Sequence, residues 1–256
     1  MFFLVGILSL VGSLLTFYSG FGLGTILLPV FMLFFSIEES IALVAVVHFL
    51  NNVLKFILIG KNVDGSLFLR FGLPSVIGAF MGAFILKNTG ESIVLFSYAL
   101  GSKIYQVQLI KLVIGILMLG FTIMEFFPTI KVNVSKKQNV FIGGLASGFF
   151  GGLSGHQGAL RSLFLIKLAN SKESLLATGV AIACMVDITR MSIYFKNIQH
   201  LNIASHLNLL AVACICAFAG AFVGSKLLKK ITLSFVQNIS ATFIVIIALL
   251  LISGLL

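Results

Sequence analysis

Apolar runs fill almost the whole chain, and they constrain the fold more than any other feature. The hydrophobic pattern places ten of them, at about 2–18, 22–35, 39–60, 66–87, 105–127, 139–152, 157–169, 173–195, 202–226 and 232–254. Only 9% of the residues are charged, whereas a soluble domain carries about 25%. Helices of about 20 apolar residues cross a bilayer. The sequence therefore predicts an all-α integral membrane protein with a single membrane domain over 1–256.

Lysine and arginine give the chain a net charge of +10. Most of them lie in the connections between apolar runs, where membrane proteins carry the positive residues of their cytoplasmic side. We therefore expect contact with a lipid bilayer and no nucleic-acid partner. The apolar start has neither a basic leader nor a small-residue cleavage site, so no cleaved signal peptide is expected. The expected location is the cell membrane, the inner or plasma membrane of a bacterium, with several crossings.

The three cysteines, Cys184, Cys214 and Cys216, all lie within apolar runs and form no CxxC pair. This placement is typical of small buried hydrophobic residues. It predicts neither a disulfide framework nor a metal site. We expect no cofactor.

The two halves of the chain match at an offset of 135 residues, the separation of Glu38 from Glu173. Asn52 falls on the similar Asp187 in the same register. Apolar residues match easily by chance, but charged and amide residues in one register indicate a duplication. The chain then divides into a first repeat, a basic linker and a second repeat: 1–127, 128–138 and 139–256.

Each half opens with two short apolar runs and continues with three longer ones. If each short pair enters the membrane and returns, each half makes an odd number of net crossings and the halves are inverted. The basic connections near Lys61, 131–137, 167–172 and 226–230 then share one side, as the positive-inside rule requires. We therefore predict inverted repeats with both termini outside the cell.

A glycine-rich stretch separates the two short runs of each half, near 19–25 and near 154–161. Irregular backbone inside a membrane persists only where it is buried in protein or lines a polar cavity. Paired broken segments in corresponding halves point to the central site of a transporter, and a helix that begins there directs free N–H groups and partial positive charge toward its start. The two breaks therefore predict an anion site, although glycines also permit close helix packing.

The first break, Gly20-Phe-Gly-Leu-Gly-Thr-Ile-Leu-Leu-Pro29, resembles the signature of the TauE/SafE family of membrane permeases. Gly151-Gly-Leu-Ser-Gly155 stands where that family has its second signature. The resemblance covers nearly the whole chain and implies a polytopic transporter for sulfite, other sulfur-containing anions or organosulfonates. The chain departs from the pattern in His156-Gln-Gly-Ala-Leu-Arg161, which replaces the usual glycine run, and at Phe164, where proline is common.

Arg161 is the most informative single residue, because a guanidinium within an apolar run is costly unless it is paired or hydrated. Its planar fork suits an oxyanion, and the alternative is a salt bridge to Asp187. His156 offers a hydrogen bond or a proton, or bonds a backbone carbonyl. The expected substrate-binding residues are Gly20, Gly22, Gly24, Thr25, Asn52, Gly155, His156, Gln157, Gly158 and Arg161.

A second group of charged residues lies within the third run of each half. Asp187 and Arg190 are three residues apart and share a helix face, which predicts a local ion pair. Otherwise Asp187 pairs with Arg161 or accepts a proton. Lys55 of the first half falls on Arg190 at the offset of 135 residues, and Asn52 lies one helical turn before Lys55. We assign Asp187, Arg190 and Lys55 to coupling or to ion pairing.

These features predict a secondary transporter for a small anion that works by alternating access of one half against the other. The chain carries no GxxxxGK[ST], HExxH or GxSxG motif, so neither ATP hydrolysis nor an enzyme is expected. The alternatives are a transporter or channel for a cation or neutral solute, with Asp187 and Asn52 as ligands, and a non-transporting scaffold. A homodimer and coupling to protons or sodium are all compatible with the sequence.

Overall fold

The computed structural model describes residues 1–19, 23–89, 93–126, 137–194, 203–227 and 233–255. Helices in the first half are α1 (Phe2–Ser19), α2 (Leu23–Met32), α3 (Ile37–Ile59), the short η1 (Gly60–Asn62), α4 (Gly65–Thr89) and α5 (Leu109–Phe126). Helices in the second half are α6 (Lys137–Ser154), α7 (Gly158–Leu165), α8 (Lys172–Tyr194), the short η3 (Ile203–His206), α9 (Leu207–Leu227) and α10 (Leu233–Ser253). Strands β1 (Val94–Leu100) and β2 (Lys103–Gln108) precede α5. Most of the linker predicted at 128–138 lies outside the described residues.

Four helical segments of the described chain are long and apolar enough to cross a membrane: Ile37–Asn62, Gly65–Asn88, Lys172–Tyr194 and Leu207–Lys226. Large apolar side chains also cover the outside of the bundle. Phe3, for example, is 81% exposed and Ile57 is 73% exposed. Lipid accommodates such a surface at little cost, whereas contiguous apolar patches of this kind are rare on soluble proteins. The predicted class, an all-α membrane protein, is confirmed.

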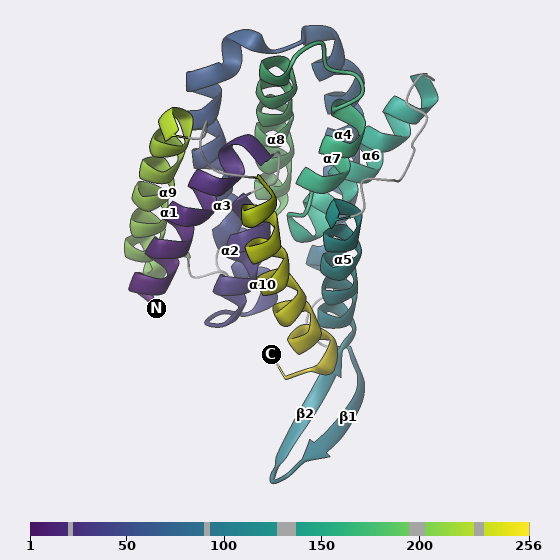
Figure 1. Cartoon of the computed structure of the whole chain (residues 1–256). Coiled ribbons are helices and arrows are strands. Elements are labelled where there is room, and N and C mark those ends of the chain that lie inside the picture. Colours follow the sequence, from purple (N-terminus) through teal and green to yellow (C-terminus); the bar gives the residue numbers. More distant parts are fainter. Residues whose placement is uncertain (20–22, 90–92, 127–136, 195–202, 228–232, 256) are drawn as a thin grey trace.

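Two pairs of helices enter the bundle and turn back inside it. α1 rises from the end that carries both termini and α2 returns toward that end, whereas α6 enters from the opposite end and α7 returns there (Figure 1). α3 and α8 pack against each other. α1 packs along α9 and α4 packs along α6, so helices of each half lie against helices of the other.

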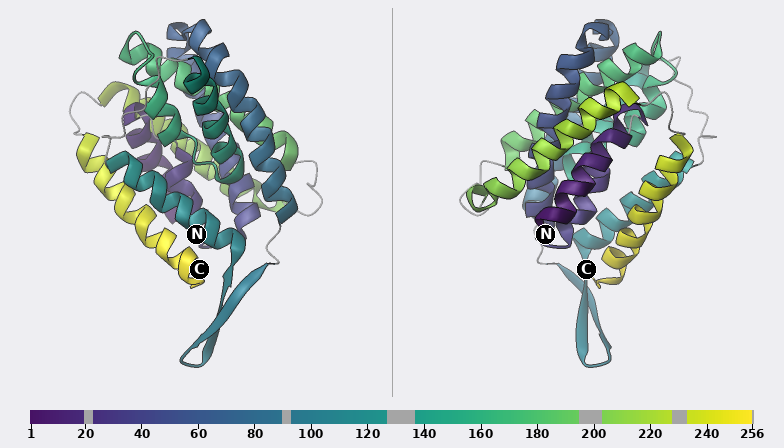
Figure 2. Two further views of the ribbon diagram at one scale, coloured as in Figure 1. Left: turned by 90° about the vertical axis from the view of Figure 1, so that its right-hand side faces the viewer. Right: turned by 60° about the vertical axis from the view of Figure 1, so that its left-hand side comes forward.

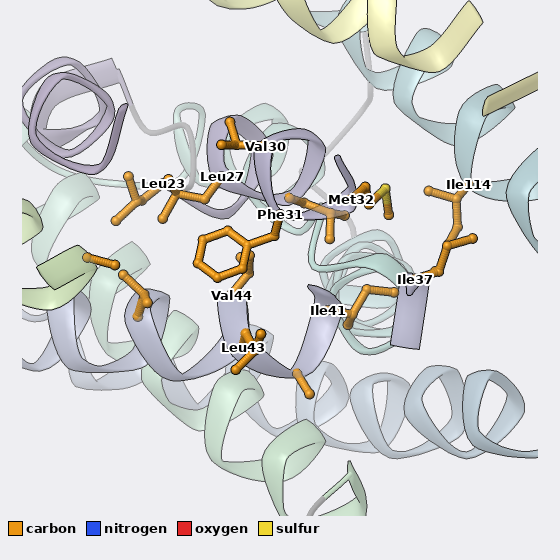
Figure 3. Close-up of a cluster of buried hydrophobic side chains, with 14 of the residues drawn as sticks. Leu23, Leu27, Val30, Phe31, Met32, Ile37, Ile41, Leu43, Val44 and Ile114 are labelled. Carbon is orange, nitrogen blue, oxygen red and sulfur yellow. The ribbon is translucent and has the colours of Figure 1, made fainter. Parts of the chain in front are cut away.

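The larger buried apolar cluster encloses α2. Leu23, Leu27 and Phe31 of α2 lie in it together with Leu43 and Val44 of α3 (Figure 3). A helix of ten residues is about 15 Å long, half of the roughly 30 Å of hydrocarbon in a bilayer. All ten residues of α2 are buried, so protein surrounds this short helix on every side, as a broken helix in a membrane requires.

Glycines line the contact between α4 and α6. A methyl group at Gly78 or Gly82 of α4 would overlap the backbone of α6, and one at Gly148 or Gly152 of α6 would overlap carbonyl oxygens of α4. Gly220 of α9 meets the backbone of α1 in the same way. Small residues let helix backbones approach closely where lipid provides no hydrophobic driving force, and here they join the two halves of the chain.

The connector at 88–104, which the sequence left unassigned, contains most of a β-hairpin. Its strands pair antiparallel with Tyr98 opposite Tyr105, and Gly101 turns the chain with a φ of 64°. The hairpin extends away from the helices at the end that carries both termini (Figure 2). The hydroxyl group of Tyr98 in β1 donates a 2.6 Å hydrogen bond to the backbone carbonyl of Ser253 at the end of α10. The apolar run expected over 105–127 therefore becomes helical only at Leu109.

Candidate functional site

The two glycine breaks meet inside the bundle. A Cβ atom on Gly24, at the start of α2, would lie 3.7 Å from the carbonyl oxygen of Gly155 and 3.6 Å from the ring of His48. Gly155 has a φ of +80°, a conformation that glycine adopts without strain. A Cβ atom there would lie 2.8 Å from Nη1 of Arg190. Glycine at this position therefore lets a guanidinium approach the backbone of the break.

Asp187 of α8 is the centre of the buried polar network. Its Oδ1 accepts hydrogen bonds from Nε of Arg190 at 3.0 Å and from Nε2 of Gln157 at 3.4 Å. Its Oδ2 lies 2.7 Å from Nδ1 of His48 and 3.3 Å from Nδ2 of Asn52. His48 and Asn52 come from α3, so the carboxylate joins both halves. An ionised carboxylate only accepts hydrogen bonds, so Nδ1 of His48 carries the proton in this contact.

Arg190 forms the ion pair with Asp187 that the three-residue spacing predicts. Its Nη2 lies 2.8 Å from Oδ1 of Asp187, and its Nε donates a 3.0 Å hydrogen bond to the same oxygen. Nη1 and Nη2 find no hydrogen-bond partner in the described part of the chain. Arg190 is fully buried. Its Nη2 is held in the ion pair with Asp187, so Nη1 is the nitrogen that remains available to another acceptor.

Arg161 of α7 reaches the same network through Gln157. Its Nη1 donates a 3.2 Å hydrogen bond to Oε1 of Gln157, whose amide nitrogen in turn donates to Asp187. The direct salt bridge between Arg161 and Asp187, considered from the sequence, is not formed among the described contacts. Arg161 is 6% exposed, and no carboxylate of the described residues forms a salt bridge with it.

Lys55 of α3 is the buried cation of the first half. Its Nζ lies 3.5 Å from Oγ1 of Thr16 and 5.5 Å from the ring centre of Phe17. Lys55 is 4% exposed, and the positive charge of Arg161 is close enough to repel its ammonium group. No carboxylate among the described residues pairs with it.

His156 lies in the second break, between α6 and α7. Its Nδ1 is 3.0 Å from the carbonyl oxygen of Ser154 and 3.2 Å from the hydroxyl of the same residue. Its ring stacks on Phe121 of α5 at 6.2 Å between centres. The predicted contact of His156 with a backbone carbonyl is therefore made by Nδ1. The other ring nitrogen, Nε2, is buried without a hydrogen-bond partner in the described chain.

The remaining expected site residues divide into two groups. Thr25 is buried in the first turn of α2, and Gly158 is the first residue of α7. Gly20 and Gly22 lie outside the described residues. Sequence reasoning did not assign His48 to the site. Its signal was its position one helical turn before Asn52, which places both side chains on one face of α3.

Among the described residues, the buried cations Lys55, Arg161 and Arg190 therefore outnumber the one buried acid, Asp187. In the described part of the chain, no three histidine, cysteine, aspartate or glutamate residues cluster as metal ligands. Broken helices whose ends meet at a buried charged site are the architecture of a membrane transporter. The fold and the site thus define a multi-pass membrane protein of the transporter class.

The chain belongs to the family described as sulfite exporter TauE/SafE, whose model matches residues 3–251. That match spans both breaks and all the helices that form the site. It is a family of membrane transporters, in agreement with the resemblance carried by 20–29. Comparison with curated proteins and with solved structures finds no match to the chain.

Proposed function

We propose that this chain is a secondary transporter of the cell membrane that moves a small anion by alternating access. Sulfite, another sulfur-containing oxyanion or an organosulfonate is the proposed substrate class, in keeping with the family. The observation that carries the proposal is the excess of buried positive charge beside the two breaks.

An uncompensated charge in a medium of low dielectric is strongly unfavourable. Among the described residues, Lys55 and Arg161 have no carboxylate in contact. Arg190 pairs with Asp187, the one buried acid of the described chain, and that carboxylate also contacts His48. A bound anion would supply the missing negative charge. The starts of α2 and α7 would add the partial positive charge of two helix N-termini. Arg161 and Arg190 would provide the guanidinium forks that suit oxyanions.

A cation site is disfavoured by the surroundings of Asp187. Both of its oxygens already accept hydrogen bonds from positive or polar donors, including Arg190, His48 and Asn52. A cation would have to displace these donors and would then lie beside Arg190. An anion needs neither change.

Alternating access is supported by the internal arrangement of the chain. α1 and α6 begin at Phe2 and Lys137, and α3 and α8 begin at Ile37 and Lys172, so both pairs keep the offset of 135 residues. α1–α2 and α6–α7 enter from opposite ends (Figure 1), as expected for inverted repeats. Transporters built in this way expose a central site by moving one repeat against the other.

The test is anion flux through the purified protein reconstituted in lipid vesicles, with sulfite, sulfate, thiosulfate and organosulfonates as the panel. We expect saturable flux of at least one of these anions above that of protein-free vesicles. Sodium and potassium should show no such flux in the same vesicles. Cation flux without anion flux would overturn the proposal.

A further inference from the structure

Two buried polar atoms at the second break have neither a hydrogen bond nor an ion-pair contact within the described chain: Nε2 of His156 and Nη1 of Arg190. Both side chains are nine-tenths or more buried, at 2% and 0% exposure. Gly155 links the two atoms, because it precedes His156 in the chain and a Cβ atom on it would lie 2.8 Å from Nη1 of Arg190. The large majority of buried polar side-chain atoms are hydrogen-bonded, so two unpartnered atoms at the same break point to a ligand that contacts both.

The contacts of the other ring nitrogen determine what Nε2 of His156 can do. The carbonyl oxygen of Ser154, 3.0 Å from Nδ1, can only accept a hydrogen bond. The hydroxyl of Ser154 already donates its hydrogen to the carbonyl of Phe150 at 3.1 Å, so toward Nδ1 it can also only accept. The proton of a neutral ring therefore sits on Nδ1. Nε2 then carries a lone pair and accepts.

The surroundings of His156 favour this neutral ring. Arg190 faces it from α8 with a positive charge, the uncharged ring of Phe121 faces it from α5, and Ser154 faces it from α6. No carboxylate contacts it in the described chain. A second positive charge beside the buried Arg190 would be unfavourable. The second break therefore presents one acceptor, Nε2, beside the donors of a guanidinium.

An anion that satisfies both groups must carry a hydrogen of its own. We propose that the substrate is an oxyanion that retains an acidic O–H group, which donates to Nε2 of His156 while a charged oxygen accepts from Nη1 of Arg190. The inference rests on the proposed function and narrows it to hydrogen-bearing oxyanions. A proton would then cross the membrane on the substrate itself, without a separate proton carrier in the protein.

Two anions of nearly the same shape test this directly. The methylphosphonate monoanion carries one O–H group, and methanesulfonate is also a monoanion but has none. We expect purified wild-type protein to bind methylphosphonate at least about tenfold more tightly, because a site built to pair a ligand hydroxyl discriminates against ligands that lack it. The preference should disappear when the pH is raised until the phosphonate loses its second proton. Isothermal titration calorimetry measures both affinities.

A variant and a matched control locate the effect. His156→Gln replaces the fixed acceptor by an amide that can present a donor or an acceptor, so the two anions should bind about equally. His206→Gln changes another histidine, which is partly exposed and pairs with Glu39 at 2.9 Å, and it should keep the wild-type ratio. If His156→Gln fails to fold, the wild-type ratio and its pH dependence decide alone.

The outcomes separate this inference from the proposed function. Equal binding of both anions by the wild type would overturn the inference and leave anion transport standing. An unchanged preference in folded His156→Gln would overturn the assignment to His156. Failure of every anion, the sulfur-containing panel included, to bind or move would overturn the proposed function itself.

Discussion

Nδ1 of His48 lies 2.7 Å from Oδ2 of Asp187, and this contact joins α3 to α8 in the buried centre of the protein. The two residues are 139 positions apart in the chain. Arg190 approaches the other oxygen of the same carboxylate. One negative charge therefore holds a histidine of the first half and an arginine of the second half in the same site.

Asp187→Asn should reduce stability strongly. The substitution leaves Arg190 as an uncompensated buried charge, which costs about 3–5 kcal/mol of folding stability when one partner of a buried pair is removed. The amide nitrogen of the new asparagine would also face hydrogen-bond donors. Thermal unfolding of the purified protein in detergent measures the effect. His48→Gln is the matched control, because glutamine retains a donor, and its loss should be smaller. Equal stability of Asp187→Asn and the wild type would show that the carboxylate charge does not hold the network together.

Arg161→Lys and Arg161→Gln should weaken anion binding to different degrees. Lysine keeps the charge and loses the planar fork, whereas glutamine loses both. Removal of one partner of a buried charged contact costs about 2–5 kcal/mol, roughly thirtyfold or more in affinity. Titration of folded, purified variants with sulfite measures the change. Wild-type binding by Arg161→Gln would mean that Arg161 does not contact the anion.

Lys55→Met should separate binding from stability. Methionine has a similar length and removes a buried charge that no described carboxylate pairs, so the unfolding temperature should stay equal or rise. Anion affinity should fall, because the site loses one cation. The measurements are a thermal melt and a sulfite titration of the same sample. A lower unfolding temperature would indicate that Lys55 has a structural partner, and an unchanged affinity would place it outside the site.

Gly148→Ala should destabilise the α4–α6 contact. Its methyl group would overlap the carbonyl oxygen of Ser75, and overpacking of this kind costs about 1–3 kcal/mol. Gly120→Ala in α5 is the control, since nothing lies within 4 Å of the added carbon and alanine favours helix. Thermal melts of the two purified variants compare their unfolding temperatures. Similar unfolding temperatures would mean that α4 and α6 can separate without loss.

We predict the membrane topology from the distribution of basic residues. Lys61, at the end opposite the termini, should be inside the cell, whereas both termini and the hairpin should be outside. An impermeant thiol reagent applied to intact cells should label Lys103→Cys and leave Lys61→Cys unlabelled until the cells are opened. Lys136, also expected inside, lies outside the described residues. Labelling of Lys61→Cys in intact cells would reverse the orientation.

Tertiary packing decided the features that depend on long-range geometry. The sequence placed Asp187 and Arg190 on one helix face because a helix fixes neighbours three residues apart. It could not bring His48 to Asp187, because that distance depends on how α3 packs on α8. The hairpin was equally hidden, since strand pairing depends on the register between partners and the strands are largely exposed.

The sequence by itself determined the apolar helices, the glycine-rich stretches between them and the cations nearby, because hydrophobicity and residue identity are local properties of the chain. The duplication stays a prediction. Only the folded structure showed that Gln157 connects Arg161 to Asp187 and that Nε2 of His156 faces no partner in the described chain. The direction in which a buried hydrogen bond points depends on every helix around it. Local pattern therefore pointed to most members of the buried polar network, and packing decided which of their atoms contact one another.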